Sequence, residues 1–206
     1  MTTTIEHPIS MLRRITRAVL WTIAALVLGI GSAWWAVKKM PGGGESIRVG
    51  AWQANTRAGS ADADMYTRAG IAVNALLALG RAETMYFVAT TDDAGNPLRS
   101  RCTYRVGGAP PKARWWSITA YADDMFLFDA PNHHYSLNGT TASLDANGNF
   151  AFTTGAVEQA ATYWLPTPGD RGVVLTLRLY NPERSLQTAP ASLQAPSILA
   201  IGGCQS

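Results

Sequence analysis

The chain has 206 residues, of which 47% are hydrophobic and 15% charged, with 17 Lys and Arg against 14 Asp and Glu. This composition excludes a disordered chain, which would be poor in apolar residues and rich in net charge. With 19 glycines and two cysteines, the chain is also neither collagen-like nor disulfide-dense. A pI near 9.0 favours nucleic acid or an acidic membrane as partner only if the basic residues lie on the folded domain.

The excess positive charge lies at the N-terminus. Residues 1–40 hold five basic residues and one acid, which is +4, so the remainder holds twelve basic residues and thirteen acids, which is −1. The basic residues of this segment are Arg13, Arg14, Arg17, Lys38 and Lys39. Because the rest of the chain is near neutral, we expect no nucleic-acid partner.

Residues 18–37 form an uncharged run of twenty residues. A helix of about twenty apolar residues crosses a hydrocarbon core of roughly 30 Å. Trp21 lies near one end and Trp34 and Trp35 near the other, as in an interfacial aromatic belt. Because the larger basic cluster stays in the cytoplasm, we expect residues 1–17 there, a single-pass anchor at 18–37 in the bacterial inner membrane, and a periplasmic C-terminal domain.

Two other interpretations of this run fit less well. A cleaved signal peptide has an apolar region of about 7 to 15 residues followed by small residues at its cleavage site. This run is longer, and the bulky Trp34 and Trp35 stand where small residues would be needed. A core helix of a soluble protein usually has a polar face, which is absent here.

The glycine-rich stretch after Met40 begins an expected linker at 38–60, with Ile47, Val49 and Trp52 docking on the domain at 61–206. A helix is predicted from about 62 to 79, because apolar residues recur there at helical spacing. Asp62 and Asp64 suit the positive end of its dipole.

Beyond Arg81 the apolar period changes to two, which predicts strands. The expected strands cover residues 84–90, 98–106, 114–121, 150–154 and 173–180. Turn residues separate them, and the two Asp-rich turns at 92–97 and 145–149 favour hairpins over calcium loops, since both lack the later Glu. We therefore expect a mainly β fold, an antiparallel jelly-roll-like β-sandwich with one packed helix, preceded by the transmembrane helix.

The two cysteines, Cys102 and Cys204, would both meet an oxidising compartment if the domain is periplasmic. A disulfide between them would tie the C-terminal tail to the sheet and close a long loop, which stabilises the fold in the chain-entropy model. The alternative is two independent thiols, one buried and one at a frayed end. Their spacing matches no zinc motif, so we expect no metal site.

No familiar catalytic or nucleotide-binding motif is present, and no cofactor is expected. The weak catalytic candidates are Asp124, Asp129, His133 and His134. One histidine could act as acid or base with a nearby aspartate. The simpler interpretation is a polar loop with exposed imidazoles, because adjacent histidines in a strand point to opposite faces.

Large aromatic side chains gather in the second half of the chain and could line a pocket for a carbohydrate or an aromatic ligand. Core packing is their commoner use. The weak ligand-binding candidates are Trp115, Trp116, Tyr121, Trp164, Arg178 and Tyr180. The arginines at 99, 101 and 105 could bind an anion, pair with acids, or simply cover a solvated strand face.

Several stretches resemble the bacterial "domain of unknown function 1214" family. They are TRAGIAVNALLALGRAETMYFVATTDDAGNPLRSRCTYRV at 67–106, ARWWSITAYADDMFLF at 113–128, Tyr135-Ser136, Trp164-Leu165-Pro166 and LTLRLY at 175–180. The resemblance covers roughly residues 64–204, and some relatives share the single N-terminal helix and cysteines at the positions of Cys102 and Cys204. It implies a β-sandwich of jelly-roll type and offers no established reaction.

In larger relatives this module follows a "domain of unknown function 1254" in one polypeptide, so the resemblance implies a separately encoded companion here. The adjacent His133 and His134 depart from the family pattern, which has Asn or Gly before Arg-Tyr-Ser. We therefore expect a membrane-anchored periplasmic binding or assembly module. The alternative is a cell-envelope hydrolase or lyase acting on a sugar or a small lipid-like substrate.

Overall fold

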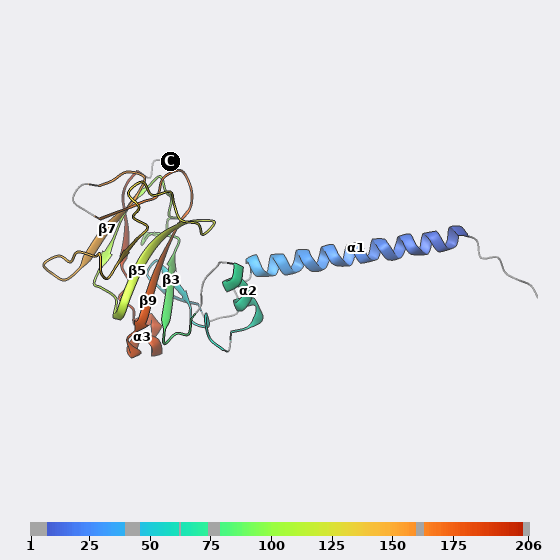
Figure 1. Ribbon diagram of the computed structural model, residues 1–206, viewed down its shortest axis with the longest axis horizontal. Coiled ribbons are helices and arrows are strands. Elements are labelled where there is room, and N and C mark those ends of the chain that lie inside the picture. Colours follow the sequence, from blue (N-terminus) through green and yellow to red (C-terminus); the bar gives the residue numbers. More distant parts are fainter. Residues whose placement is uncertain (1–7, 40–45, 62, 74–78, 160–162, 204–206) are drawn as a thin grey trace, which may run out of the picture.

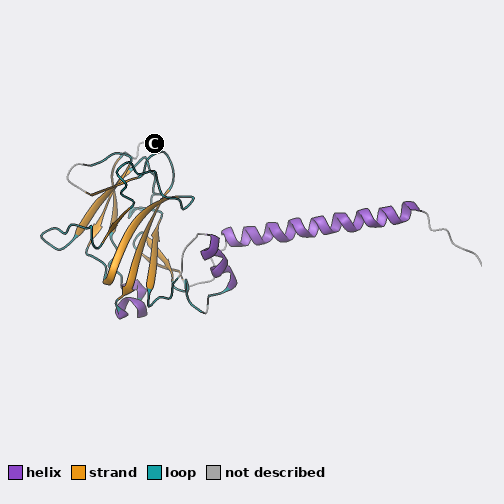
Figure 2. Ribbon diagram, viewed as in Figure 1, coloured by secondary structure: helices purple, strands orange, loops and turns teal. Residues whose placement is uncertain are grey.

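A computed structural model of the chain describes residues 8–39, 46–61, 63–73, 79–159 and 163–203. The long helix α1 extends away from a domain built mainly of strands (Figures 1 and 2). The helices are α1 (Pro8–Lys39), α2 (Met65–Val73), α3 (Arg184–Thr188) and the 3-10 turn η1 (Pro190–Ser192). The strands are β1 (Ser46–Val49), β2 (Trp52–Asn55), β3 (Thr84–Ala89), β4 (Thr103–Gly108), β5 (Ala113–Ala122), β6 (Ser136–Asn138), β7 (Phe150–Gly155), β8 (Tyr163–Pro166), β9 (Val173–Pro182) and β10 (Ser197–Gly202).

Helix α1 confirms the expected apolar helix. Its segment Met11–Ala36 is long and apolar enough to cross a membrane. The hydroxyl groups of Thr16, Thr22 and Ser32 donate hydrogen bonds to backbone carbonyls three or four residues earlier. These bonds satisfy the few polar side chains in the run, as an apolar surrounding requires.

Two sheets form the domain, one of six strands in the order β1-β2-β3-β9-β5-β6 and one of four in the order β10-β4-β7-β8. The expectation of a mainly β fold is confirmed. One pairing differs from the expected antiparallel pattern, because β7 and β8 run parallel. The connection between these strands includes residues that the structure does not describe.

The core lies between the two sheets. Phe87, Leu177, Ile118 and Leu137 stand in one row across β3, β9, β5 and β6, each at most 1% exposed. Tyr104, Val106, Phe152 and Ile198 come from the second sheet into the same apolar cluster. Burying a side chain of this size contributes about 1.5–3 kcal/mol, so the alternation seen in the sequence sets which face of each strand is inside.

The prediction that residues 38–60 form a linker is wrong for residues 46–55, which belong to the sheet. Strands β1 and β2 pair with each other, and β2 pairs with β3, so the sandwich begins at Ser46 and not at residue 61. Trp52 is fully buried, which is the physical reason that this segment is part of the domain.

The strand predicted at 98–106 begins only at Thr103. Leu98, Ser100 and Cys102 are buried and the arginines between them exposed, so the alternation itself is correct. This stretch bonds to the β8–β9 connection through its backbone, where Ser100 N donates to Arg171 O at 2.9 Å. The Ser100 side chain adds two bonds: its Oγ donates to Gly169 O at 2.7 Å and accepts from Arg171 N at 2.8 Å. Alternating burial therefore occurs here without a strand.

The two Asp-rich segments form turns, as predicted, and the structure shows that the two turns have the same geometry. The carboxylate of Asp92 accepts from the backbone N–H of Asn96, and that of Asp145 accepts from the N–H groups of Asn147 and Asn149. Gly95 and Gly148 occupy positive φ at the same place in each turn. Both carboxylates are thus used in holding a turn.

Helix α2 begins where its N-terminal acid predicts. The Asp64 carboxylate accepts from the backbone N–H groups of Tyr66 and Thr67, both at 2.9 Å. These bonds lower the pKa of Asp64 below its ordinary value. The described helix runs from Met65 to Val73, so it begins about three residues after the predicted start. Residues 62 and 74–78 of the predicted span lie outside the described residues, and residue 79 is not helical.

Candidate ligand-binding face

The outer face of the six-stranded sheet brings four of the six ligand-binding candidates together. Strand register places Tyr180 beside Trp115. Arg178 lies two residues before Tyr180 on β9 and therefore on the same face. Tyr86 of β3 stands opposite Arg178. We name the set Arg178, Tyr86, Tyr121, Tyr180 and Trp115 the arginine–tyrosine face; all five side chains are partly buried.

Two neighbouring hydroxyl groups on β5 hold the Arg178 guanidinium in place. Its Nη2 donates to Tyr121 Oη at 2.8 Å, and its Nη1 donates to Thr119 Oγ1 at 3.2 Å. The guanidinium carbon also lies 5.4 Å from the centre of the Tyr121 ring, within range of a cation–π contact. The cation is therefore fixed on the sheet by neutral groups.

Aromatic side chains from β3, β5 and β9 lie around this cation. The rings of Trp115 and Tyr180 have centroids 5.2 Å apart, and Trp115 Nε1 donates to Thr140 Oγ1 at 3.2 Å. Burial raises the pKa of Tyr86, the proximity of Tyr180 raises it further, and the charge of Arg178 opposes both. The phenol of Tyr86 is therefore neutral at physiological pH, and the positive charge of Arg178 is not cancelled by a phenolate.

Arg178 forms no ion pair within the described part of the chain. The ion pairs there join Arg101 to Asp170 and Arg171 to Asp123 and Asp124, on other loops. A guanidinium has five N–H donors, and the two bonds to β5 occupy one on each terminal nitrogen. Three donors of a partly buried cation thus have no protein acceptor among the described residues.

Beneath the large side chains lies a polar floor. Thr176 and Thr119 lie on the same outer face and are 0% and 7% exposed. Thr119 accepts from Arg178, whereas Thr176 Oγ1 has no hydrogen-bond partner within the described chain. A buried hydroxyl group without a hydrogen-bond partner costs free energy.

The other two aromatic candidates lie elsewhere. Trp116 points into the core, where it is 4% exposed and its ring lies 4.6 Å from that of Phe150. Trp164 belongs to β8 in the four-stranded sheet, and its Nε1 donates to Gly155 O at 3.0 Å. For Trp116 the structure therefore gives the core-packing role considered in the sequence.

The catalytic candidates do not form one described cluster. Arg171 binds Asp124 at 2.6 Å and Asp123 at 3.2 Å, and it lowers the pKa of Asp124 below its ordinary value. Asp129 is exposed and takes part in none of the described ion pairs. An aspartate held ionised by an arginine is a poor proton donor, so this arrangement does not favour acid catalysis at Asp124.

The two histidines lie in an exposed turn. His133 has a positive φ of 57°, and His134 stacks on Tyr163 with ring centroids 4.7 Å apart. His134 Nδ1 also lies 3.1 Å from the amide nitrogen of Asn132. Among the described residues no group of three or more His, Cys, Asp or Glu side chains is arranged to hold a metal ion.

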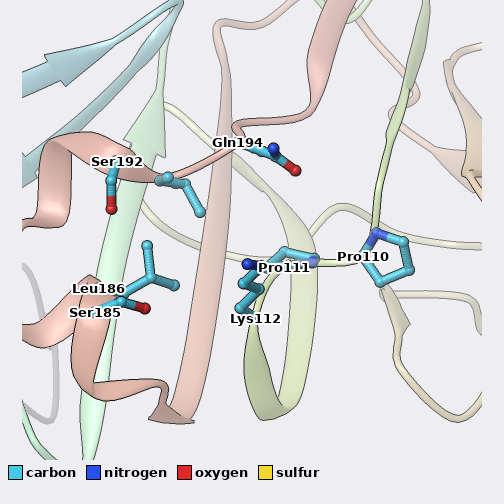
Figure 3. A pocket seen from close by; sticks show the side chains of 8 residues that line it. Pro110, Pro111, Lys112, Ser185, Leu186, Ser192 and Gln194 are labelled. Atoms are coloured by element: carbon cyan, nitrogen blue, oxygen red, sulfur yellow. The ribbon is translucent and has the colours of Figure 1, made fainter.

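None of the four described surface hollows is lined by Arg178 or by the catalytic candidates. One of them has a volume of about 170 Å³ and lies between the β4–β5 connection and the α3–η1 segment (Figure 3). It is lined by Pro110, Pro111, Lys112, Ser185, Leu186, Ser192, Leu193 and Gln194. Ligand pockets usually have about 300–1,000 Å³, so this hollow is small for a substrate site.

Cys102 is 4% exposed, just before β4, whereas Cys204 lies outside the described residues, and the predicted disulfide stays a prediction. Strand β10 brings the preceding Gly203 close to Cys102: a Cβ added to Gly203 would lie 3.5 Å from the Cα of Cys102.

Sequence reasoning did not identify Tyr86 as a member of the face, or Thr119 as a hydrogen-bond partner of Arg178. The alternation of Thr84, Tyr86 and Val88 with buried residues would have placed Tyr86 on the outer side of its strand. Its contact with Arg178 needs the β3–β9 register, which one sequence does not contain.

Similarity to one solved structure supports the fold. A crystal structure of the VPA0106 protein from Vibrio parahaemolyticus is similar to 97% of this chain, with 18% identity and a TM-score of 0.58. This chain spans 47% of that protein's length. A putative uncharacterized protein from Burkholderia cenocepacia is similar over 60% of this chain and 31% of its own, with 16% identity and a TM-score of 0.41.

No curated protein matches the chain. The sequence model of one family does, over residues 83–184, which run from the start of β3 to the end of β9 and include the whole arginine–tyrosine face. The chain therefore belongs to the family described as protein of unknown function (DUF1214).

Proposed function

We propose that the chain is a membrane-anchored binding or assembly module whose working surface is the arginine–tyrosine face. The observation that carries the proposal is the placing of one arginine and four large aromatic side chains together on a sheet face. Trp, Tyr and Arg are the residue types that contribute most to protein interfaces. Of the five residues of the face, Tyr86 borders one of the four described hollows, and Arg178 borders none of them, so this face fits a broad macromolecular surface better than an enclosed substrate.

The proposed orientation places residues 1–17 in the cytoplasm and the sandwich in the periplasm. The apolar length of α1 and the three arginines before its apolar run support this orientation. A reporter enzyme fused after Ser206 tests it. Alkaline phosphatase, which is active only outside the cytoplasm, should be active there. An active cytoplasmic reporter at the same position would contradict this topology.

The proposed partner is a companion protein of the "domain of unknown function 1254" family. The solved Vibrio chain of the same fold is about twice as long as this one, which supports a second unit beside the sandwich. Purification of the tagged full chain from native membranes in mild detergent tests the proposal. The expected result is recovery of that companion in a fixed ratio. Repeated recovery of the chain without it would contradict the proposal.

A further inference from the structure

The arginine–tyrosine face has an uncompensated positive charge at its centre. Arg178 is partly buried, bonds only to the neutral hydroxyl groups of Thr119 and Tyr121, and has no carboxylate partner in the described chain. Removing a cation from water costs free energy unless an anion or strong acceptors compensate it. Arg178 therefore lacks a charged acceptor within the described chain, and a bound partner could supply one.

The remaining donors of Arg178 specify the chemistry of that acceptor. The planar guanidinium retains three N–H groups, and its orientation is already fixed by the two bonds to β5. A fixed fork of donors matches the two oxygens of a carboxylate, which arginine binds in bidentate form. Pre-ordering of the side chain lowers the entropy lost on binding.

The surroundings favour a protein side chain as the source of the carboxylate. Trp115 and Tyr180 pack together at one side of Arg178 and Tyr86 stands beside it on β3, so aromatic rings border the charge on two sides. In a complex, such a border helps to exclude water from a central ion pair, as in the well-packed centre of a protein interface. None of the four described hollows is lined by Arg178, so an enclosing pocket for a free small anion is not found at this point.

We propose that the arginine–tyrosine face is the docking surface for the companion protein, and that Arg178 binds an Asp or Glu side chain of that companion. This inference rests on the proposed function, because it assumes that the companion exists. It adds the location of the interface, the residue at its centre and the charge that the partner must bring.

The test uses the tagged full chain co-expressed with the companion, solubilised from membranes and purified by the tag. Arg178→Gln should lower recovery of the companion at least tenfold, because truncating one side of an interfacial charge pair leaves the other unpaired. Arg178→Lys, which retains the charge but loses the fork, should lower it by a smaller factor. Arg105→Gln is the matched control, since Arg105 is an exposed arginine of β4 in the other sheet.

Thermal unfolding of each purified variant distinguishes loss of the interface from loss of the fold.

A charge exchange tests the ion pair itself. Arg178→Glu should abolish recovery of the companion, and one Asp→Arg or Glu→Arg change in the companion should restore that recovery. Equal recovery of the companion with wild type and Arg178→Gln would overturn the docking surface and leave the proposed function intact. No recovery with wild type would overturn both. A small anion seen by native mass spectrometry on the wild type and lost in Arg178→Gln would also overturn the inference, in favour of a small ligand.

Discussion

Trp52 donates a hydrogen bond from its Nε1 to the carbonyl oxygen of Pro196 at 2.7 Å. The bond joins β2, near the start of the domain, to the residue just before β10, 144 positions later. Trp52 is fully buried, so the bond is made inside the core. The two ends of the domain are thus connected to one another, and neither is a tail on a fold formed by the rest.

Trp52→Ala should therefore destabilise the sandwich strongly. Truncating a buried tryptophan costs about 3–5 kcal/mol, and the carbonyl of Pro196 would lose its donor. Chemical denaturation of the full chain in detergent, followed by near-UV circular dichroism, measures the change. Trp21→Ala is the control, because Trp21 is 76% exposed on α1. An unfolding midpoint unchanged by Trp52→Ala would contradict the assignment of residues 46–55 to the domain.

The oxidised chain should contain a disulfide between Cys102 and Cys204. Strand β10 pairs Gly202, two positions before Cys204, with Thr103, the residue after Cys102. Mass spectrometry after alkylation without reductant should find neither cysteine alkylated. In the chain-entropy model a bridge closing a loop of about 100 residues stabilises the fold by about 4–5 kcal/mol, so Cys204→Ser should lower the unfolding midpoint. Two alkylated cysteines in the untreated protein would rule out the bridge.

The stabilising effect of Asp124 should depend on pH. Because Arg171 lowers its folded pKa, the ionised carboxylate stabilises the fold above the ordinary pKa of an aspartate. This contribution is lost as the pH falls through the lowered folded value. Asp124→Asn should therefore reduce the thermal midpoint slightly at neutral pH, since the pair is solvent-screened, and the difference from wild type should vanish in strong acid. Asp129→Asn, at an exposed site outside the described ion pairs, should leave the thermal midpoint at neutral pH unchanged.

Gly107→Ala should destabilise β4. A Cβ at this position would lie 2.6 Å from the carbonyl oxygen of Phe150 and 3.2 Å from Ala151, both in the paired backbone of β7. Overpacking of this kind costs about 1–3 kcal/mol. Gly70→Ala in α2 provides the comparison, because nothing lies within 4 Å of its Cβ position and alanine favours a helix by about 0.5–1 kcal/mol. Equal stability of the two variants in denaturant titrations would contradict the close β4–β7 approach.

The sequence predicted what depends on local pattern. Alternation identified the buried faces at Leu98–Val106 and 173–180, and the apolar run predicted α1. The alternation did not show that residues 98–102 bond to a loop, because buried and exposed residues alternate equally well beside a loop and within a sheet. Strands β1 and β2 have four residues each, which is too short for a period to emerge.

Which residues form the candidate site depends on the pairing of strands that are far apart in the sequence. Trp115 and Trp116 are adjacent in the sequence, and only the face of β5 that each occupies decides that one borders Arg178 and the other fills the core. Arg178 and Tyr121 are 57 residues apart and meet because β9 pairs with β5. Composition therefore selected suitable residue types, while the strand register selected which of them form a site.

The most direct test of the docking surface is site-specific photo-cross-linking in native membranes. A photoreactive phenylalanine replaces Tyr180 on the arginine–tyrosine face in one chain and Leu199 on β10 in another; Leu199 is 50% exposed in the other sheet. We predict that the companion cross-links to position 180 and not to position 199. Cross-linking of the companion at position 199 alone would contradict the docking surface.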